Sequence, residues 1–127
     1  MTDAETMLNK LVNCINAHDT AGVIALCAVD HVFIDSLGNR LSGAAQLAQG
    51  WNWYFATFPD YRIEIQTVAA QVDVVLACGL ASGTHAPTGK SWNIPAAWRA
   101  KIVNGRVAEW QVYADNKPVY ELLARTV

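Results

Sequence analysis

Two aspartates, each at the end of a predicted β-strand, are the residues of this chain best placed to carry out chemistry. Asp35 ends the alternating segment HVFID, and Asp115 follows the alternating segment EWQVYA. A carboxylate that faces an apolar pocket can take a proton from carbon and deliver one to oxygen, which is general acid/base catalysis. Each aspartate also has a structural interpretation, because Asp35 can begin the turn DSLG and Asp115 can cap the next helix. Both interpretations stay open on sequence grounds.

A second group of candidate residues is aromatic and is suited to the wall of a binding pocket. In SWNIPAAWRAKIV, alternation places Trp92 and Trp98 on one face together with alanines, which leave space beside the indoles. In GAAQLAQGWNWYFATF, helical spacing places Trp51, Tyr54 and Phe58 on one stripe. Packing in an ordinary core also explains both patterns, and a helical stripe of this kind is more often core, so a binding role for these residues is a hypothesis.

The elements expected to position these side chains are helices in the first half of the chain and strands in the second. A capping box at residues 2–5 begins a first helix predicted from about Asp3 to His18, and Asp19 is the expected cap of a second helix. The remaining elements, in order, are a strand at 31–35, a helix at 43–58 capped by Ser42, strands at 61–70, 72–85, 91–103 and 107–114, and a closing helix from Asn116. Helices and strands that are segregated in this way indicate an α+β fold.

Composition narrows the classes of partner. The 127 residues fit one domain, 1–127, and 53% of them are apolar while only 16% are charged, which indicates a cavity or a dimer interface. A net charge of −2 without a basic run argues against nucleic acid and anionic membranes, and no apolar stretch is long enough to span a bilayer. Cys14, Cys27 and Cys78 lack C-x-x-C spacing, which argues against disulfides and zinc and indicates a reduced, cytoplasmic setting. No motif predicts a metal ion or any other cofactor.

Three stretches carry a resemblance to a known family. NAHDTAGVIALCAVDHVFIDSLGNRLSGAAQLAQGWNWYFATFPD, GTHAPTGKSW and NGRVAEWQVYADN together resemble the SnoaL-like polyketide cyclases of the nuclear transport factor 2-like superfamily, which also contains ketosteroid isomerases. The resemblance implies a cone-shaped α+β barrel, in which a curved, mostly antiparallel sheet is wrapped by N-terminal helices around an apolar cavity. It also implies a homodimer formed through the sheet.

The resemblance assigns expected roles to individual residues. Asp115, in W-x4-D, matches the general acid/base of the polyketide cyclases, and Asp35 matches the proton-shuttling aspartate of the ketosteroid isomerases. Phe33 and Tyr113 share the strand faces of these two aspartates, and His85 ends a long strand at a frequent rim position, although a turn-bonded histidine is the alternative there. The expected catalytic residues are therefore Asp115 and Asp35, and the expected substrate-binding residues are Trp98, Tyr54, Trp51, Phe58, Trp92, Tyr113, Phe33 and His85.

Two departures from the ketosteroid isomerase pattern argue against steroid isomerase activity. The first helix has no tyrosine, and the segment 91–103 has no carboxylate; Trp98 stands there instead and can donate one hydrogen bond. Three functions stay open. The first is a cofactor-independent isomerase, cyclase or lyase acting on an apolar carbonyl compound, the second is a binding module for an apolar small molecule, and the third is an interaction protein that uses its sheet.

Overall fold

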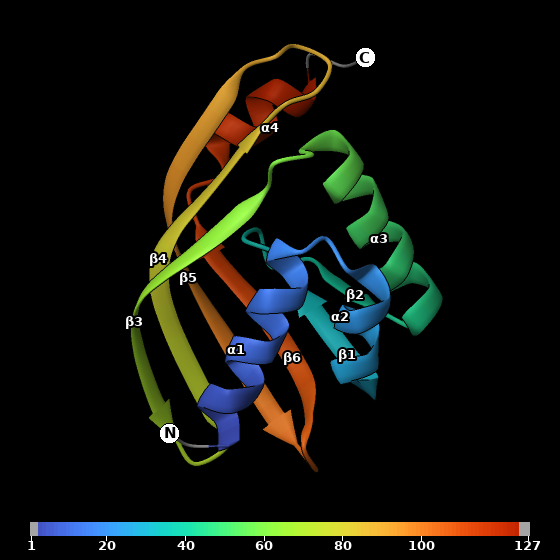
Figure 1. Cartoon of the computed structure of the whole chain (residues 1–127), viewed down its shortest axis with the longest axis vertical. Helices are drawn as coiled ribbons and strands as arrows, with labels where there is room; N and C mark the ends of the chain where they lie inside the picture. The colour runs from blue at the N-terminus through green and yellow to red at the C-terminus, as the bar shows by residue number, and fades with distance from the viewer. Residues whose placement is uncertain (1–2, 125–127) are drawn as a thin grey trace.

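The computed structural model describes residues 3–124, which form a strongly bent sheet with helices against its inner side (Figure 1). Figure 1 shows α1, α2 and α3 on one side of the sheet and α4 near the end where β4 and β5 are joined. The elements are α1 (Asp3–Asn16), α2 (Thr20–Leu26), β1 (Cys27–Ile34), β2 (Arg40–Ser42), α3 (Ala44–Thr57), β3 (Arg62–Gln71), β4 (Val74–Thr84), β5 (Ser91–Val103), β6 (Arg106–Ala114) and α4 (Lys117–Ala124). This arrangement confirms the predicted α+β fold.

The six strands lie in the order β2-β1-β6-β5-β4-β3. Neighbours are antiparallel except β1 and β6, which pair in parallel, so the sheet is mostly antiparallel as predicted. Since β2 and β3 lie at opposite ends of this order, the sheet does not close on itself. Its open, bent form agrees with the cone that the resemblance to SnoaL-like proteins implied.

The bend in the sheet has a local cause in the pairing of β3 with β4. The register shifts between Ile65 and Thr67, which marks a β-bulge, and bulges bend the strand that carries them. Gly79 lies on β4 opposite this bulge, and a Cβ atom there would overlap the carbonyl oxygen of Glu64. The missing side chain of Gly79 therefore permits the close approach of the two strands.

The core lies between the inner face of the sheet and the helices. Along β5 every second residue from Trp92 to Ile102 is buried, which confirms the face predicted from alternation. Leu8, Leu11 and Ile15 of α1 are buried, and α1 packs on β3, β4 and β5. Burying apolar side chains from both layers is the main source of stability for such a fold.

Most predicted ends are correct within a few residues, and the exceptions have clear reasons. Asn104 and Gly105 have φ of 52° and 72°, as the predicted type I′ turn requires, and Asp19 accepts a hydrogen bond from Gly22 N at 3.0 Å as the predicted cap. The cap of α3 is Gly43 rather than Ser42. His18, which we predicted to end α1, lies beyond it at a φ of 55°.

Two further differences concern the ends of the chain and its first strands. The capping box predicted at residues 2–5 includes Thr2, which lies outside the described residues. The strand β1 begins at Cys27 rather than at His31, and β2 occupies residues 40–42, where we expected no strand. In the part of the chain described by the structure, no helix is long and apolar enough to span a membrane.

Candidate functional site

A pocket of about 270 Å³ lies between the inner face of the sheet, α3 and α4. Its wall is mainly aromatic and aliphatic, and Asp35 is the only charged residue among the described residues that line it. The lining residues are Phe33, Asp35, Ser36, Leu41, Leu47, Gly50, Trp51, Trp53, Tyr54, Tyr61, Ala81, Trp92, Ile94, Ala96, Trp98, Trp110, Val112, Ala114, Asn116, Val119, Tyr120 and Leu123. Such a wall suits an apolar ligand that carries few polar groups.

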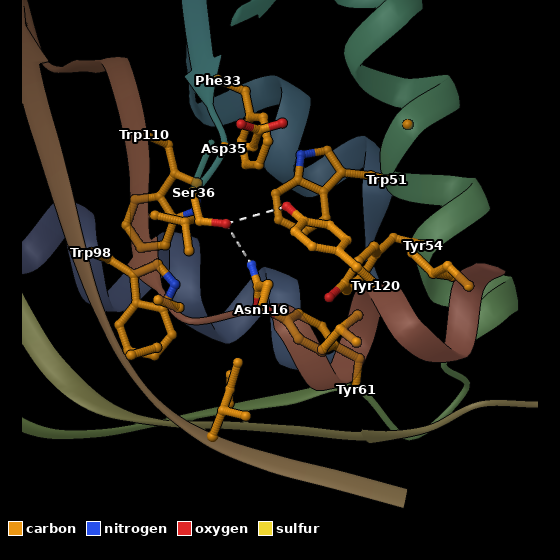
Figure 2. A pocket seen from close by; sticks show the side chains of 18 of the residues that line it. Phe33, Asp35, Ser36, Trp51, Tyr54, Tyr61, Trp98, Trp110, Asn116 and Tyr120 are labelled. Atoms are coloured by element: carbon orange, nitrogen blue, oxygen red, sulfur yellow. Dashed lines mark hydrogen bonds between the residues drawn. The ribbon is translucent and has the colours of Figure 1, made fainter. Parts of the chain in front are cut away.

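Flat aromatic surfaces face one another across this pocket. The indoles of Trp98 and Trp110 are stacked at 6.4 Å between ring centroids, with an interplanar angle of 12°. Figure 2 shows these two side chains on one side, with Trp51, Tyr54 and Tyr61 on the other. Small residues such as Ala96 leave room between the rings. The pocket is therefore suited to a flat ligand that makes contact with aromatic faces.

Asp35 follows β1 directly and lines the pocket while being half-buried. Its Oδ1 accepts hydrogen bonds from the backbone N–H groups of Leu37 and Asn39, both at 2.9 Å, and its Oδ2 accepts one from Asn39 Nδ2 at 3.1 Å. The carboxylate thus has the turn role that the sequence indicated and also faces the pocket. These bonds fix its orientation, because both carboxylate oxygens are held by the turn.

Asp115 lies in a different place from Asp35. It is exposed, and its Oδ1 accepts a hydrogen bond from the backbone N–H of Lys117 at 3.1 Å, at the start of α4. Asp115 thus accepts from a backbone N–H that would otherwise be free at the first residue of α4, a structural role of the kind that the sequence left open for it. It lines a second, outer depression of about 460 Å³ and not the aromatic pocket, so the two aspartates do not face one space.

A hydrogen-bonded network of three polar side chains separates the pocket from the outer depression. Asn116 Nδ2 donates to Ser36 Oγ at 2.9 Å, and Ser36 Oγ lies 3.2 Å from the hydroxyl oxygen of Tyr120 (Figure 2). All three residues line both spaces. The network joins the loop after β1 to α4, and sequence reasoning missed it because Ser36 and Tyr120 are 84 residues apart.

Two tyrosines place their phenol groups at the pocket. The rings of Tyr54 and Tyr61 meet edge to face, with centroids 4.8 Å apart and an interplanar angle of 84°. Burial raises the pKa of both tyrosines well above the ordinary value, and the proximity of Tyr61 adds to the effect on Tyr54. Both phenols are therefore neutral at physiological pH. Tyr61 was not among the predicted site residues, although alternation along the predicted strand 61–70 places it on the same face as the buried Ile63.

The other predicted binding residues divide into two groups. Phe33, Trp51, Tyr54, Trp92 and Trp98 line the pocket, whereas Phe58, Tyr113 and His85 do not.

The three residues away from the pocket have other surroundings. Phe58 is fully buried behind the wall, with its ring centroid 5.4 Å from that of Trp92. Tyr113 is 47% exposed and pairs with Ala97 on the outer face of the sheet. His85 is fully buried; its Nδ1 lies 2.8 Å from Thr88 Oγ1, which is the turn-bonded alternative. Among residues 3–124, no group of three His, Cys, Asp or Glu side chains could hold a metal ion.

Comparison with known proteins identifies relatives over most of the chain. A family model described as a SnoaL-like domain matches residues 8–110. No curated protein gives a significant match to the sequence.

Solved structures give close matches in shape at low sequence identity. AclR, a proposed hydroxylase from Streptomyces galilaeus, is 22% identical with a TM-score of 0.80, covering 96% of both chains. IdmH, a proposed polyketide cyclase from Streptomyces antibioticus, is 21% identical with a TM-score of 0.78, covering 95% of this chain and 98% of IdmH. TerC, co-crystallised with polyporic acid, is 14% identical with a TM-score of 0.83, covering 97% of this chain and 99% of TerC. At these identities the likeness establishes the fold alone.

Proposed function

Because this chain belongs to the SnoaL-like domain family, we propose that its aromatic pocket binds an apolar small molecule with a carbonyl group and catalyses proton transfer on it. Asp35 is the general base of this proposal. The reaction is of the isomerase, cyclase or lyase type and needs no cofactor. Asp115, the other aspartate expected to be catalytic, is assigned a structural role at the start of α4, where it accepts from Lys117 N.

The observation that carries the proposal is a single carboxylate in an otherwise uncharged, aromatic pocket. Among the described lining residues, no lysine, arginine or histidine accompanies Asp35. A carboxylate in such surroundings interacts more strongly with a reacting group than it would in water. In the proposed step, the proton of a C–H bond next to the carbonyl moves to a carboxylate oxygen of Asp35. The electron pair of that bond then forms the enolate, whose oxygen gains the negative charge.

The size and shape of the pocket limit the substrate class. Its volume of about 270 Å³ is just below the range of roughly 300–1,000 Å³ found for most ligand sites. Two or three fused or linked rings therefore suit it better than a long or branched molecule. TerC, which shares the fold, was co-crystallised with polyporic acid, and this supports a small-molecule ligand for the present chain as well.

A second candidate function is binding without turnover. The observation in its favour is that both oxygens of Asp35 already accept hydrogen bonds from Leu37 and Asn39. Both oxygens are therefore engaged by donors of the turn, which limits the approach of a ligand C–H group to either of them. In that case Asp35 is a turn residue, and the pocket only holds the ligand.

An exchange experiment separates the two functions. The bicyclic ketone 2-tetralone is incubated with the protein in D2O, and the replacement of its α-protons by deuterium is followed by NMR. We expect acceleration by the wild type, a loss of about 100-fold or more in Asp35→Asn, and little change in the matched control Asp115→Asn. Asparagine retains an acceptor for the turn, and circular dichroism verifies folding.

The outcomes are distinct. Wild-type protein that binds 2-tetralone, detected by ligand-observed NMR, without accelerating exchange would favour the binding module. Loss of exchange in Asp115→Asn together with full exchange in Asp35→Asn would reverse the assignment of the two aspartates.

We also propose that the outer face of the sheet forms a homodimer. Leu76, Cys78 and Tyr113 are exposed there, and Leu76 and Tyr113 keep 49% and 47% of their surfaces exposed. Contiguous exposed apolar side chains of this kind mark contact surfaces. Light scattering should give twice the monomer mass for the wild type and the monomer mass for Leu76→Asp; a monomeric wild type would contradict the proposal.

A further inference from the structure

We infer that Tyr54 and Tyr61 form a donor subsite, a pair of neutral hydroxyl groups that binds an oxygen atom of the ligand. The inference rests on the proposed function, because it concerns how the same pocket recognises a carbonyl compound. It adds a chemical requirement that the aromatic wall alone does not impose. The ligand must present a hydrogen-bond acceptor at this part of the pocket.

The first observation is that both hydroxyl groups lack a hydrogen-bond partner among the residues that the structure describes. Within residues 3–124, neither the Tyr54 hydroxyl nor the Tyr61 hydroxyl makes a hydrogen bond. Two buried side-chain polar atoms in this part of the chain have neither a hydrogen-bond partner nor exposed surface. They are His85 Nε2 and Trp92 Nε1. The two hydroxyl oxygens are unpaired and are not among these buried atoms, so they reach the open volume of the pocket.

The second observation is that both side chains are held rigidly. Tyr61 is 8% exposed, its backbone N–H donates to Phe58 O at 2.9 Å, and its carbonyl oxygen lies 2.9 Å from His18 Nε2. Tyr54 packs against Phe58 on α3 with ring centroids 4.9 Å apart. Donors that are fixed before the ligand arrives lose little conformational freedom on binding.

The protonation state determines which ligand atoms the pair can bind. Burial raises the pKa of both phenols, and the neighbouring Tyr61 and Tyr120 raise the pKa of Tyr54 further. Each hydroxyl therefore donates a hydrogen bond and does not act as a base at neutral pH. A carbonyl oxygen accepts two such bonds, and the bonds strengthen when proton removal by Asp35 places negative charge on that oxygen.

The pair also replaces donors that this chain lacks. Ketosteroid isomerases are expected to carry a tyrosine on the first helix and a carboxylate on the strand that corresponds to residues 91–103. This chain has neither residue. Tyr54 and Tyr61 come from α3 and from the segment before β3. They are thus a separate solution to stabilising an oxygen in this pocket.

A purely structural role for the two tyrosines makes a different prediction for ligand affinity. A buried hydroxyl without a partner lowers stability relative to an apolar group of the same shape. If the phenols serve only packing, phenylalanine fills both positions at least as well and ligand affinity does not respond to the change. Removal of both oxygens should therefore leave the ligand-free protein equally or more stable while weakening the binding of carbonyl compounds.

The experiment compares two probes that differ only in the oxygen, 2-tetralone and tetralin. Dissociation constants are measured by quenching of tryptophan fluorescence for the wild type, for Tyr54→Phe/Tyr61→Phe, and for the outer-face control Tyr113→Phe. We expect the wild type to prefer 2-tetralone, the double variant to bind 2-tetralone about tenfold more weakly, and tetralin binding to stay unchanged. The control should behave as the wild type, and thermal melting should show no loss of stability in the double variant.

Each other outcome overturns the subsite. A wild type without preference for 2-tetralone, or a double variant that loses both probes equally, would assign the tyrosines to packing. The result is separable from the catalytic proposal. Tyrosine-dependent binding without proton exchange would leave the subsite standing and refute the role of Asp35 as base. Proton exchange that depends on Asp35 but not on the tyrosines would refute the subsite and leave the role of Asp35 as base standing.

Discussion

Replacing Gly79 by alanine should force β3 away from β4 at the bulge that bends the sheet. The three atoms nearest to a Cβ at this position are all backbone atoms, namely Glu64 O, Glu64 C at 2.9 Å and Ile65 Cα at 3.1 Å. A flexible side chain could move aside, but a backbone that belongs to a hydrogen-bonded ladder cannot do so without breaking the ladder. The strands must separate locally, and the pairing around Ile65 and Gly79 is lost.

The expected cost follows from this geometry. Overpacking of a well-packed site destabilises proteins by about 1–3 kcal/mol, and a backbone overlap belongs at the upper end, so we expect a loss of about 3 kcal/mol. This is a large share of the roughly 5–15 kcal/mol that stabilises a typical domain. The melting temperature should fall by roughly 10 °C.

Gly50 provides the matched control. It lies within α3, where a Cβ atom would meet only Leu41 Cδ2 at 3.4 Å. Glycine inside a helix is less favourable than alanine by about 0.5–1 kcal/mol, so Gly50→Ala should stabilise the protein by that amount.

Urea unfolding followed by circular dichroism measures both variants on one scale. The same chemical change should therefore shift the free energy of unfolding in opposite directions at the two glycines. Equal stability of Gly79→Ala and the wild type, within about 0.5 kcal/mol, would refute the view that the glycine permits the bend.

Two further predictions concern stability. Val72 lies in the exposed turn between β3 and β4 with a φ of 55°, a conformation that strains a β-branched residue. Val72→Asn should therefore raise the free energy of unfolding by about 1 kcal/mol. An unchanged free energy in urea unfolding would contradict this prediction. Burial lowers the pKa of His31 against the opposing effects of the Val107 carbonyl and of the Glu109 and Asp30 carboxylates. The unfolded chain then binds a proton at His31 more readily than the folded chain does. The stability that neutral His31 contributes is therefore complete above the unfolded pKa of about 6.5 and declines as pH falls below it. Between pH 7.5 and 5, His31→Gln should lose less stability than the wild type, and equal losses would refute the assignment.

Sequence patterns predicted the elements well where the pattern was long. β5 alternates over its full length and begins and ends where we expected, because one face packs on helices and lines the pocket while the other faces outward. β2 was missed because three residues, of which two are exposed, carry no periodic signal. It is a strand only because β1 supplies a hydrogen-bonding edge. Short edge strands depend on their neighbours, and a single sequence does not reveal them.

For the site, the same alternation contained a signal about Asp115. It placed Trp110, Val112 and Ala114 on one face of β6, and these are the residues of that strand that line the pocket. Alternation places Asp115 on the other face, together with Tyr113, which lies on the outer side of the sheet. Periodicity therefore argued against a place for Asp115 inside the pocket.

The network around Ser36 could not be predicted in this way, whereas the inward direction of Tyr61 could. Tyr61 begins the predicted strand 61–70, and alternation places it on the same face as Ile63, which is buried. Ser36 meets Asn116 and Tyr120 only through tertiary folding. Polar residues in loops are usually solvated, so their types alone give no reason to select them.

The parallel pairing of β1 with β6 has a consequence for the time course of folding. The pairing joins Cys27 to Val107 and Phe33 to Trp110, so β1 has no partner on its inner side until most of the chain has been synthesised. Contacts between residues so distant in sequence form slowly, because a long loop must close before they are gained. Asp35 and Ser36 directly follow β1, and Asn116 and Tyr120 follow β6. On the ribosome, the polar end of the pocket is therefore the last part of the molecule to be assembled.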